Sequence, residues 1–266
     1  MTVSYDGRGF AGSQQQGARR TVQSELQRAI ATLWRTEGVS TVFAGRTDAG
    51  VHAAGQVISV ADGRPDLAEC QIGRALNANL PDDLAVQAVE RLAGPFHARY
   101  DAVWREYRYR LWSGPKQPLV AGLVAQTPRR LDVAAMRTGA VALVGTRDLA
   151  SFAGGGEGVP WSDRASAPRG TVRTVLVCTI ELGPAWWRPE SGAGELIELR
   201  IVADGFLPRM VRNIAGALME IGRGSRPATW IGELLAGRDR RMAGSMAPAD
   251  GLILWRVGYG DDSYHD

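Results

Sequence analysis

Lysine is almost absent from this chain of 266 residues. Lys116 is the only one, so arginines supply 30 of the 31 basic side chains. Guanidinium groups bind phosphate in bidentate geometry and stack on bases. A GC-rich genome also favours arginine over lysine, and we expect that bias to be the larger cause. The net charge of +3 and the pI of about 9.1 indicate nucleic-acid binding only weakly.

Cysteine and histidine are also scarce. Cys70 and Cys178 lie far apart and form no CxxC pair, so we expect free, small, buried thiols in a reducing cytoplasm. The three histidines lack metal-ligand spacing, and we expect His52 and His97 to be loop or packing residues. No apolar run reaches the length of a membrane span, and no signal-peptide pattern opens the chain. These absences predict a cytoplasmic protein that does not associate with membranes.

The motifs of several cofactor-dependent and hydrolytic enzymes are either absent or lie in the wrong structural context. Gly7–Gly12 matches GxGxxG, but the next convincing helix begins only at Thr21, so no helix N-terminus meets that loop. Lys116 lies in Gly-Pro-Lys-Gln rather than in a phosphate-binding loop, and no GxSxG is present. We therefore expect no cofactor.

The periodicity of apolar residues predicts a mixed α+β fold. The content is 45% hydrophobic and 22% charged residues, as in ordinary globular proteins with one large domain or two small ones. The expected helices are 21–34, 67–78, 132–143, 210–221 and 227–236. The expected strands are 41–44, 56–60, 84–90, 102–112, 171–182, 195–203 and 252–257.

One segment is the best candidate for a domain boundary. Residues 113–130 contain three prolines and little periodicity, which is typical of a linker. We therefore expect an N-terminal half, 1–112, and a C-terminal half, 131–266, each mixing strands with about two helices. Ala153–Gly170 is rich in glycine, serine and proline, and we expect it to be a mobile loop.

The most informative stretch is Gly45–Ala53, which reads GRTDAGVHA and places Asp48 in a short turn between two expected strands. A single aspartate in a turn usually serves turn geometry, because its side chain accepts hydrogen bonds from nearby backbone N–H groups. The whole nonapeptide, however, resembles the active-site motif of the TruA family of tRNA pseudouridine synthases. The resemblance implies that Asp48 is a catalytic nucleophile.

The resemblance extends along nearly the whole chain. Six further short segments resemble family signatures and occur in the same order: Tyr5–Gly7, Arg20–Gln23, Asn77–Pro81, Phe96–Arg99, Arg105–Tyr109 and Met210–Ile214. A seventh, Ala247–Leu252, resembles the C-terminal segment whose leucine lines the uracil pocket. Each string is weak alone, but together they are specific.

The resemblance also implies roles for individual residues. Tyr107 matches the active-site tyrosine, whose ring stacks on uracil, and Arg212 matches the basic partner of the nucleophile. Leu252 matches the leucine of the uracil pocket. Arg46, two residues before Asp48, is expected to fill the space left by an extruded base or to hold a phosphate. By residue type alone, Tyr107 is equally a core tyrosine, and Arg212 is more often a solvated helix residue.

Four features depart from the family pattern. Ser13 stands where the family usually has tryptophan, which puts an RNA contact in question, and Pro208-Arg209 replaces a frequent histidine pair. The region 153–170 is longer than usual. The short N-terminus predicts a shortened first strand.

The resemblance implies a cofactor-free enzyme that isomerises uridine to pseudouridine at tRNA positions 38, 39 and 40. The resemblance implies a pseudouridine-synthase fold, in which two α/β halves with antiparallel sheets meet at a central RNA-binding cleft. It also implies a homodimer that binds the anticodon arm. Whether Asp48 attacks the uracil ring or C1′ stays open. Phosphate contacts are expected from three other arginines, Arg8, Arg19 and Arg20.

Two other classes of function compete with this interpretation. The first is a non-catalytic RNA-binding protein on the same scaffold. The second is a glycosidase, which needs a second catalytic carboxylate. Asp6, Asp62 and Asp66 are the candidates for it, but none is a convincing partner for Asp48.

Overall fold

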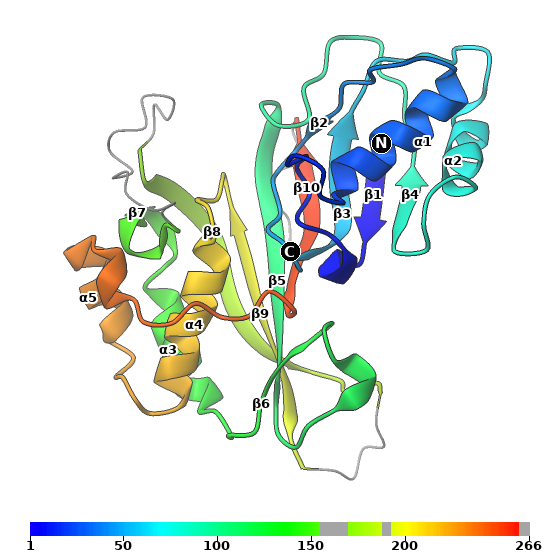
Figure 1. Cartoon of the computed structure of the whole chain (residues 1–266). Helices are drawn as coiled ribbons and strands as arrows, with labels where there is room; N and C mark the ends of the chain where they lie inside the picture. The colour runs from blue at the N-terminus through cyan, green and yellow to red at the C-terminus, as the bar shows by residue number, and fades with distance from the viewer. Residues whose placement is uncertain (155–169, 188–192, 261–266) are drawn as a thin grey trace. The chain divides into compact units, whose positions relative to one another are not determined.

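The computed structural model describes residues 1–154, 170–187 and 193–260 (Figure 1). The chain forms two compact units. The first contains Met1–Arg105 and Ile253–Asp266, and the second contains Glu106–Leu252. The chain therefore crosses from the first unit to the second within one strand and returns near its C-terminal end.

The first unit is a mainly antiparallel sheet with two helices. Its strands have the order β4-β1-β3-β10, and β2 pairs with β3. Only the β3–β10 pair is parallel among the strand pairs described in this unit. The elements are β1 (Thr2–Tyr5), α1 (Val22–Trp34), β2 (Val42–Phe43), β3 (His52–Ser59), α2 (Glu69–Asn77), β4 (Leu84–Ala88) and β10 (Leu252–Tyr259).

Helix α1 begins where the sequence predicts. The Thr21 hydroxyl accepts a hydrogen bond from the Ser24 N–H, and the Ser24 hydroxyl accepts one from the Thr21 N–H, so the two residues form a capping box. The apolar stripe of α1, which includes Leu26 and Ile30, is buried. Helices α1 and α2 lie on one side of the strands of this unit (Figure 1).

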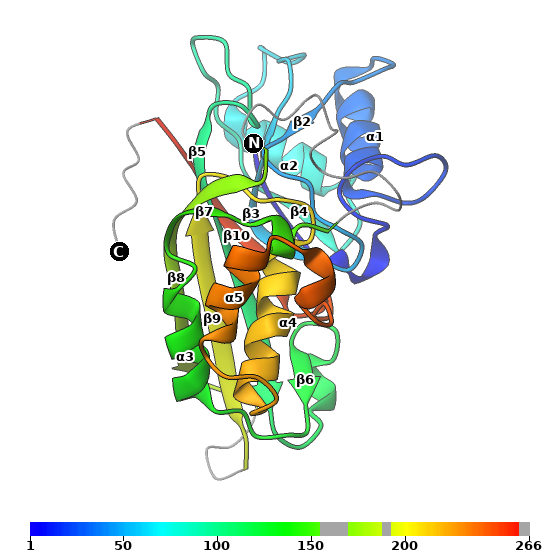
Figure 2. The ribbon, with the colours of Figure 1, turned by 90° about the vertical axis from the view of Figure 1, so that its left-hand side faces the viewer.

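The second unit is a sheet covered by three helices. Its strands have the order β5-β9-β8-β7, and the short β6 pairs in parallel with the end of β5. The strands are β5 (Ala102–Ser113), β6 (Ala125–Thr127), β7 (Gly145–Asp148), β8 (Val172–Gly183) and β9 (Glu195–Ala203). The helices are α3 (Val133–Val141), α4 (Met210–Gly222) and α5 (Trp230–Gly237). In Figure 2 all three helices lie in front of β8 and β9.

Helix α4 is the central element of the second unit. The predicted stripe, including Ile214 and Leu218, is buried, but so is almost every other residue of the helix. The opposite side of α4 is covered by the segment around Ser245. A Cβ on Gly216 would lie only 2.0 Å from the Ser245 carbonyl oxygen. Gly216 thus permits two backbones to approach closely.

The units divide the chain elsewhere than the proline-rich segment suggests. Residues 113–130 lie inside the second unit, where they include β6 and a short 3-10 helix, Pro118–Val120. Trp112, Val120 and Val124 are buried together in one hydrophobic cluster. The prolines therefore mark turns within a packed region.

Two other predictions concern the burial of the cysteines and the segment 153–170. Cys178 is buried as expected, but the prediction of a buried Cys70 is wrong, because this thiol lies on the exposed side of α2, whose buried residues are Ile72 and Leu76. Most of the expected loop 153–170 lies outside the described residues.

Candidate active site

Asp48 occupies the first position of a tight turn between β2 and β3. Its carbonyl oxygen accepts a hydrogen bond from the Val51 N–H at 3.1 Å, and Gly50 has a φ of +79°. That φ is typical of the third position of a type II turn and favours glycine there. Asp48 itself is half-buried, and Arg46 is exposed. The GRTDAGVHA motif is therefore built as a turn that presents these side chains from the sheet.

A buried polar network lies beneath the turn. The Thr47 hydroxyl is 2.8 Å from the Tyr5 hydroxyl, and the Gln56 amide donates to the Gly45 carbonyl at 2.8 Å. Burial raises the pKa of Tyr5 to about 12, although hydrogen bonds to Thr47 and Gln56 oppose this shift. The neutral phenol is therefore a fixed part of the support under Asp48.

A second set of contacts holds the far end of the turn. Gly7 packs so closely that a Cβ there would lie 2.1 Å from the Val51 carbonyl oxygen, and its N–H donates to His52 Nδ1 at 3.1 Å. His52 Nδ1 is also 3.3 Å from an Asp6 carboxylate oxygen. Burial tends to raise the pKa of Asp6, but hydrogen bonds from Arg8 and the nearness of His52 outweigh it and lower the pKa. His52 is a packing residue, as predicted.

The GxGxxG segment is part of this support. Gly7–Gly9 forms a 3-10 helix, and α1 begins only at Val22, so the segment is a turn and meets no helix N-terminus. His97 also has a local role, because its Nδ1 accepts hydrogen bonds from the N–H groups of Arg99 and Tyr100.

The carboxylates that a glycosidase would need are engaged with arginines. Asp62 pairs with Arg91 and Asp66 with Arg64, at 2.7 and 2.8 Å. Hydrogen bonds from these arginines lower the pKa of Asp62 and lower that of Asp66 to about 2. A glycosidase general acid needs a raised pKa, so this arrangement argues against that class.

Tyr107 lies on β5 in the second unit. The residue is 7% exposed, and its ring and that of Phe206 pack edge to face at a centroid distance of 4.9 Å. Tyr109, two residues further, occupies the same face of the strand. Its hydroxyl donates to the Pro248 carbonyl at 3.1 Å, and burial raises its pKa.

Arg212 lies in the first turn of α4 and is half-buried. Its Nε donates to the Ala247 carbonyl at 2.9 Å, while the Ala247 N–H donates to the Arg212 carbonyl at 3.1 Å. Arg209, the residue immediately before α4, has a left-handed backbone with a φ of +60°. For a residue other than glycine this conformation is uncommon and often marks functional sites.

Leu252 ends the segment that Arg212 anchors. The side chain is buried, and its N–H donates to the Ala249 carbonyl at 2.8 Å. The Gly251 carbonyl accepts a hydrogen bond from the Arg110 N–H of β5 at 2.8 Å. Within the second unit the structure thus connects Arg212, the segment 247–252 and β5.

The predicted site residues therefore fall into two groups. Arg46 and Asp48 belong to the first unit, whereas Tyr107, Arg212 and Leu252 belong to the second. The expected phosphate ligands Arg8 and Arg20 make ion pairs with carboxylates, as Arg20 does with Asp83 at 2.7 Å. Arg19 is exposed.

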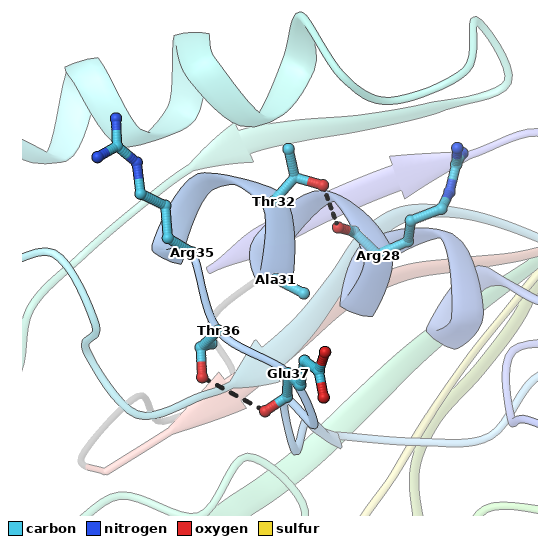
Figure 3. Close-up of a pocket in the computed structure, with 6 residues that line it drawn as sticks. All are labelled: Arg28, Ala31, Thr32, Arg35, Thr36 and Glu37. Carbon is cyan, nitrogen blue, oxygen red and sulfur yellow. Dashed lines mark hydrogen bonds between the residues drawn. The ribbon is translucent and has the colours of Figure 1, made fainter.

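Other parts of the described chain contain fewer groups that could bind a ligand or take part in a reaction. A hollow at the end of α1 contains none of the predicted site residues, and two of its hydroxyls bond to backbone carbonyls (Figure 3). It is lined by Arg28, Ala31, Thr32, Arg35, Thr36 and Glu37. In the described ranges no cluster of three histidine, cysteine or acidic side chains could hold a metal ion. The helices in those ranges all lack the length or the apolar character that a membrane span requires.

Comparison with known proteins defines the class. A family model described as tRNA pseudouridine synthase matches residues 1–101 and 140–260. The chain belongs to the tRNA pseudouridine synthase family. It is therefore an isomerase that converts uridine in tRNA to pseudouridine, and its mixed α+β architecture is the pseudouridine-synthase fold.

Several relatives align over almost the full chain. The tRNA pseudouridine synthase A of Geobacillus kaustophilus is 40% identical over 261 residues, which cover 98% of this chain and 93% of that protein. The protein of the same name from Chloroflexus aurantiacus is 42% identical, covering 97% and 87%. That from Paraburkholderia phymatum is 38% identical, covering 97% and 90%.

Proposed function

We propose that Asp48 is the nucleophile of a cofactor-free isomerisation at uridines 38, 39 and 40 of the tRNA anticodon stem-loop. The observation that carries this proposal is the construction of its turn. Tyr5, Gln56 and Gly7 bond to Thr47, Gly45 and His52, which lie on both sides of Asp48, while Asp48 itself is only half-buried. A supported turn that carries a half-buried aspartate suits covalent catalysis.

The reaction requires no net gain of atoms or electrons. The C1′–N1 bond of uridine breaks, the uracil turns, and a C1′–C5 bond forms, after which the proton on C5 is lost and N1 is protonated. The target base has to leave its stack before it can react. We leave open whether Asp48 attacks the ring or C1′, because both routes need the same ionised carboxylate.

The other residues have supporting roles in this proposal. Tyr107 stacks on the flipped uracil and places its hydroxyl near C5, and Leu252 lines the uracil pocket. Arg212 is the charge partner that favours the ionised form of Asp48. Arg46, which is exposed, fills the space of the extruded base or holds a phosphate. We further propose a cytoplasmic homodimer that binds the anticodon arm.

The test replaces Asp48 with asparagine. Asn is close to Asp in size but is neutral and poorly nucleophilic, so Asp48→Asn should bind tRNA like the wild type and form no product. Tritium release from C5-labelled uridine in tRNA measures turnover, and a titration measures binding. Asp82→Asn, a change at an exposed carboxylate of the same unit, is the matched control and should stay active.

This test also separates an enzyme from a mere RNA-binding protein. Undiminished tritium release by Asp48→Asn, with deamidation excluded by mass spectrometry, would refute the assignment of the nucleophile. Absence of tritium release from the wild type with every tRNA substrate would favour the non-catalytic alternative.

A further inference from the structure

Ser13 contacts the residue that immediately precedes Asp48. Its side chain is 1% exposed, and its Oγ accepts a hydrogen bond from the Thr47 N–H at 2.9 Å. The Ser13 N–H donates in turn to the Thr47 carbonyl at 3.0 Å. One serine thus engages both polar backbone groups of Thr47, in a region where Thr47 is itself buried.

Ser13 is held on its other side by helix α1. The Gln23 N–H donates to the Ser13 carbonyl at 3.0 Å, and the Val22 N–H donates to the Gly12 carbonyl at 3.3 Å. N–H groups in the first turn of a helix have no partner within the helix, so these bonds satisfy groups that would otherwise lack one. The segment Gly12–Ser13 therefore connects the start of a packed helix to the Asp48 turn.

Close packing leaves this connection little freedom. Gly12 has a φ of +103°, and a Cβ there would lie 3.0 Å from the Thr47 carbonyl oxygen and 3.4 Å from the Ala49 nitrogen. The Thr47 hydroxyl is occupied on the opposite side by Tyr5, at 2.8 Å. A shift of Ser13 would therefore be transmitted to the peptide that carries Asp48.

We propose that Ser13 is a positioning residue for Asp48. Its hydroxyl fixes the Thr47–Asp48 backbone and so the direction in which the carboxylate points. The inference rests on the proposed role of Asp48 as nucleophile. A displacement of about 1 Å at a reacting group can cost about 100-fold in rate. Because Ser13 acts through the backbone of Thr47, tRNA binding does not depend on it.

The experiment compares Ser13→Ala with Ser59→Ala. Ser59 is a matched control in the same unit, because its Oγ also accepts a hydrogen bond from a backbone N–H, that of Ala98 at 3.2 Å. Each variant loses one side-chain acceptor, but only the first loses it at the turn. The measurements are kcat and KM for tRNA in the tritium-release assay, the dissociation constant and the midpoint of thermal unfolding.

We expect Ser13→Ala to lower kcat at least tenfold while KM and the dissociation constant stay within twofold. Ser59→Ala should lower the unfolding midpoint similarly but keep kcat within twofold. Hydrogen exchange of the Thr47 amide should accelerate in Ser13→Ala alone, which would report the loss of its acceptor independently of activity.

Two results would overturn the inference. One is an unchanged kcat in Ser13→Ala, and the other is a loss of kcat that Ser59→Ala shares. Asp48→Asn is assayed in parallel to separate the two proposals. If it is inactive while Ser13→Ala has wild-type kcat, only the inference about Ser13 fails. If it retains turnover, the proposed nucleophile fails first.

Discussion

At the scale of single residues, Tyr5 shows how the first unit supports a turn without exposing the support to solvent. The phenol is buried, touches the Thr47 hydroxyl and accepts from the Gln56 amide at 3.4 Å. Its pKa is raised by burial from 10.0 to about 12. The folded state therefore retains the phenolic proton over a pH range in which the unfolded chain loses it.

This difference predicts a specific alkaline loss of stability. The pKa of Tyr5 is higher in the folded state than in the unfolded state. Its contribution to the free energy of unfolding is therefore fully present below pH 10 and is lost as the pH rises towards 12. The loss is at most about 2–3 kcal/mol, from about 1.4 kcal/mol per pKa unit. In urea unfolding between pH 9 and pH 12, Tyr5→Phe should show a shallower decline than the wild type. If the free energies of unfolding of the two proteins declined in parallel, Tyr5 would ionise as readily in the folded state as in the unfolded state.

The sequence could point to Asp48 but not to its supports. The nonapeptide around Asp48 is a contiguous string, so a resemblance can be recognised in it. The contact of Ser13 with Thr47 joins residues 34 positions apart and depends on the tertiary fold. The only signal in the sequence is that Ser13 departs from the family pattern, and that signal does not identify its partner.

At the scale of elements, helix α4 combines a predicted apolar stripe with a second buried side that no periodicity indicates. That side is covered by the segment around Ser245, which approaches Gly216. The caps of α1 and α3 were predictable from the local sequence, because the side chains of Thr21 and Asp132 accept hydrogen bonds from the backbone N–H groups three residues later. The short β6 and β7 were not, since three or four residues carry little periodicity.

Two glycines test this close approach. Alanine normally stabilises a helix interior by about 1 kcal/mol relative to glycine. Gly216→Ala should instead destabilise the protein by about 1–3 kcal/mol, because the added Cβ meets the Ser245 carbonyl oxygen. Gly232→Ala in α5, where nothing lies within 4 Å of the added Cβ, should stabilise it. Equal stabilisation by both changes in urea unfolding would contradict the packing described for α4.

At the scale of the whole molecule, part of the arginine content is engaged with carboxylates of the protein itself. Arg8, Arg20, Arg64 and Arg91 all form ion pairs with nearby carboxylates. Composition alone could not show this, because pairing depends on which side chains the fold brings together. We therefore expect fewer phosphate contacts than arginines.

Binding of tRNA should nevertheless weaken steeply with salt. Three phosphate contacts would reduce the association constant by about 20- to 40-fold between 50 and 200 mM salt, because bound cations are released. Titrations at several salt concentrations measure this slope, and Asp48→Asn should share it, since a nucleophile need not contact phosphate. An affinity that does not change with salt would count against arginine–phosphate recognition.

The division of the chain has a consequence for biosynthesis. Strand β10 pairs with β3 beside the Asp48 turn, Ile253 opposite His52 and Leu254 opposite Ala53, yet it is the last strand described. The ribosome must therefore complete the entire second unit before the first unit can acquire this strand. At about 5–20 residues per second, the nascent first unit waits roughly 7–30 s with the β10 side of β3 unpaired. The β10 side of β3, which adjoins the Asp48 turn, is therefore paired only after the second unit has been synthesised, so a chain that ends before β10 would leave that side of β3 unpaired.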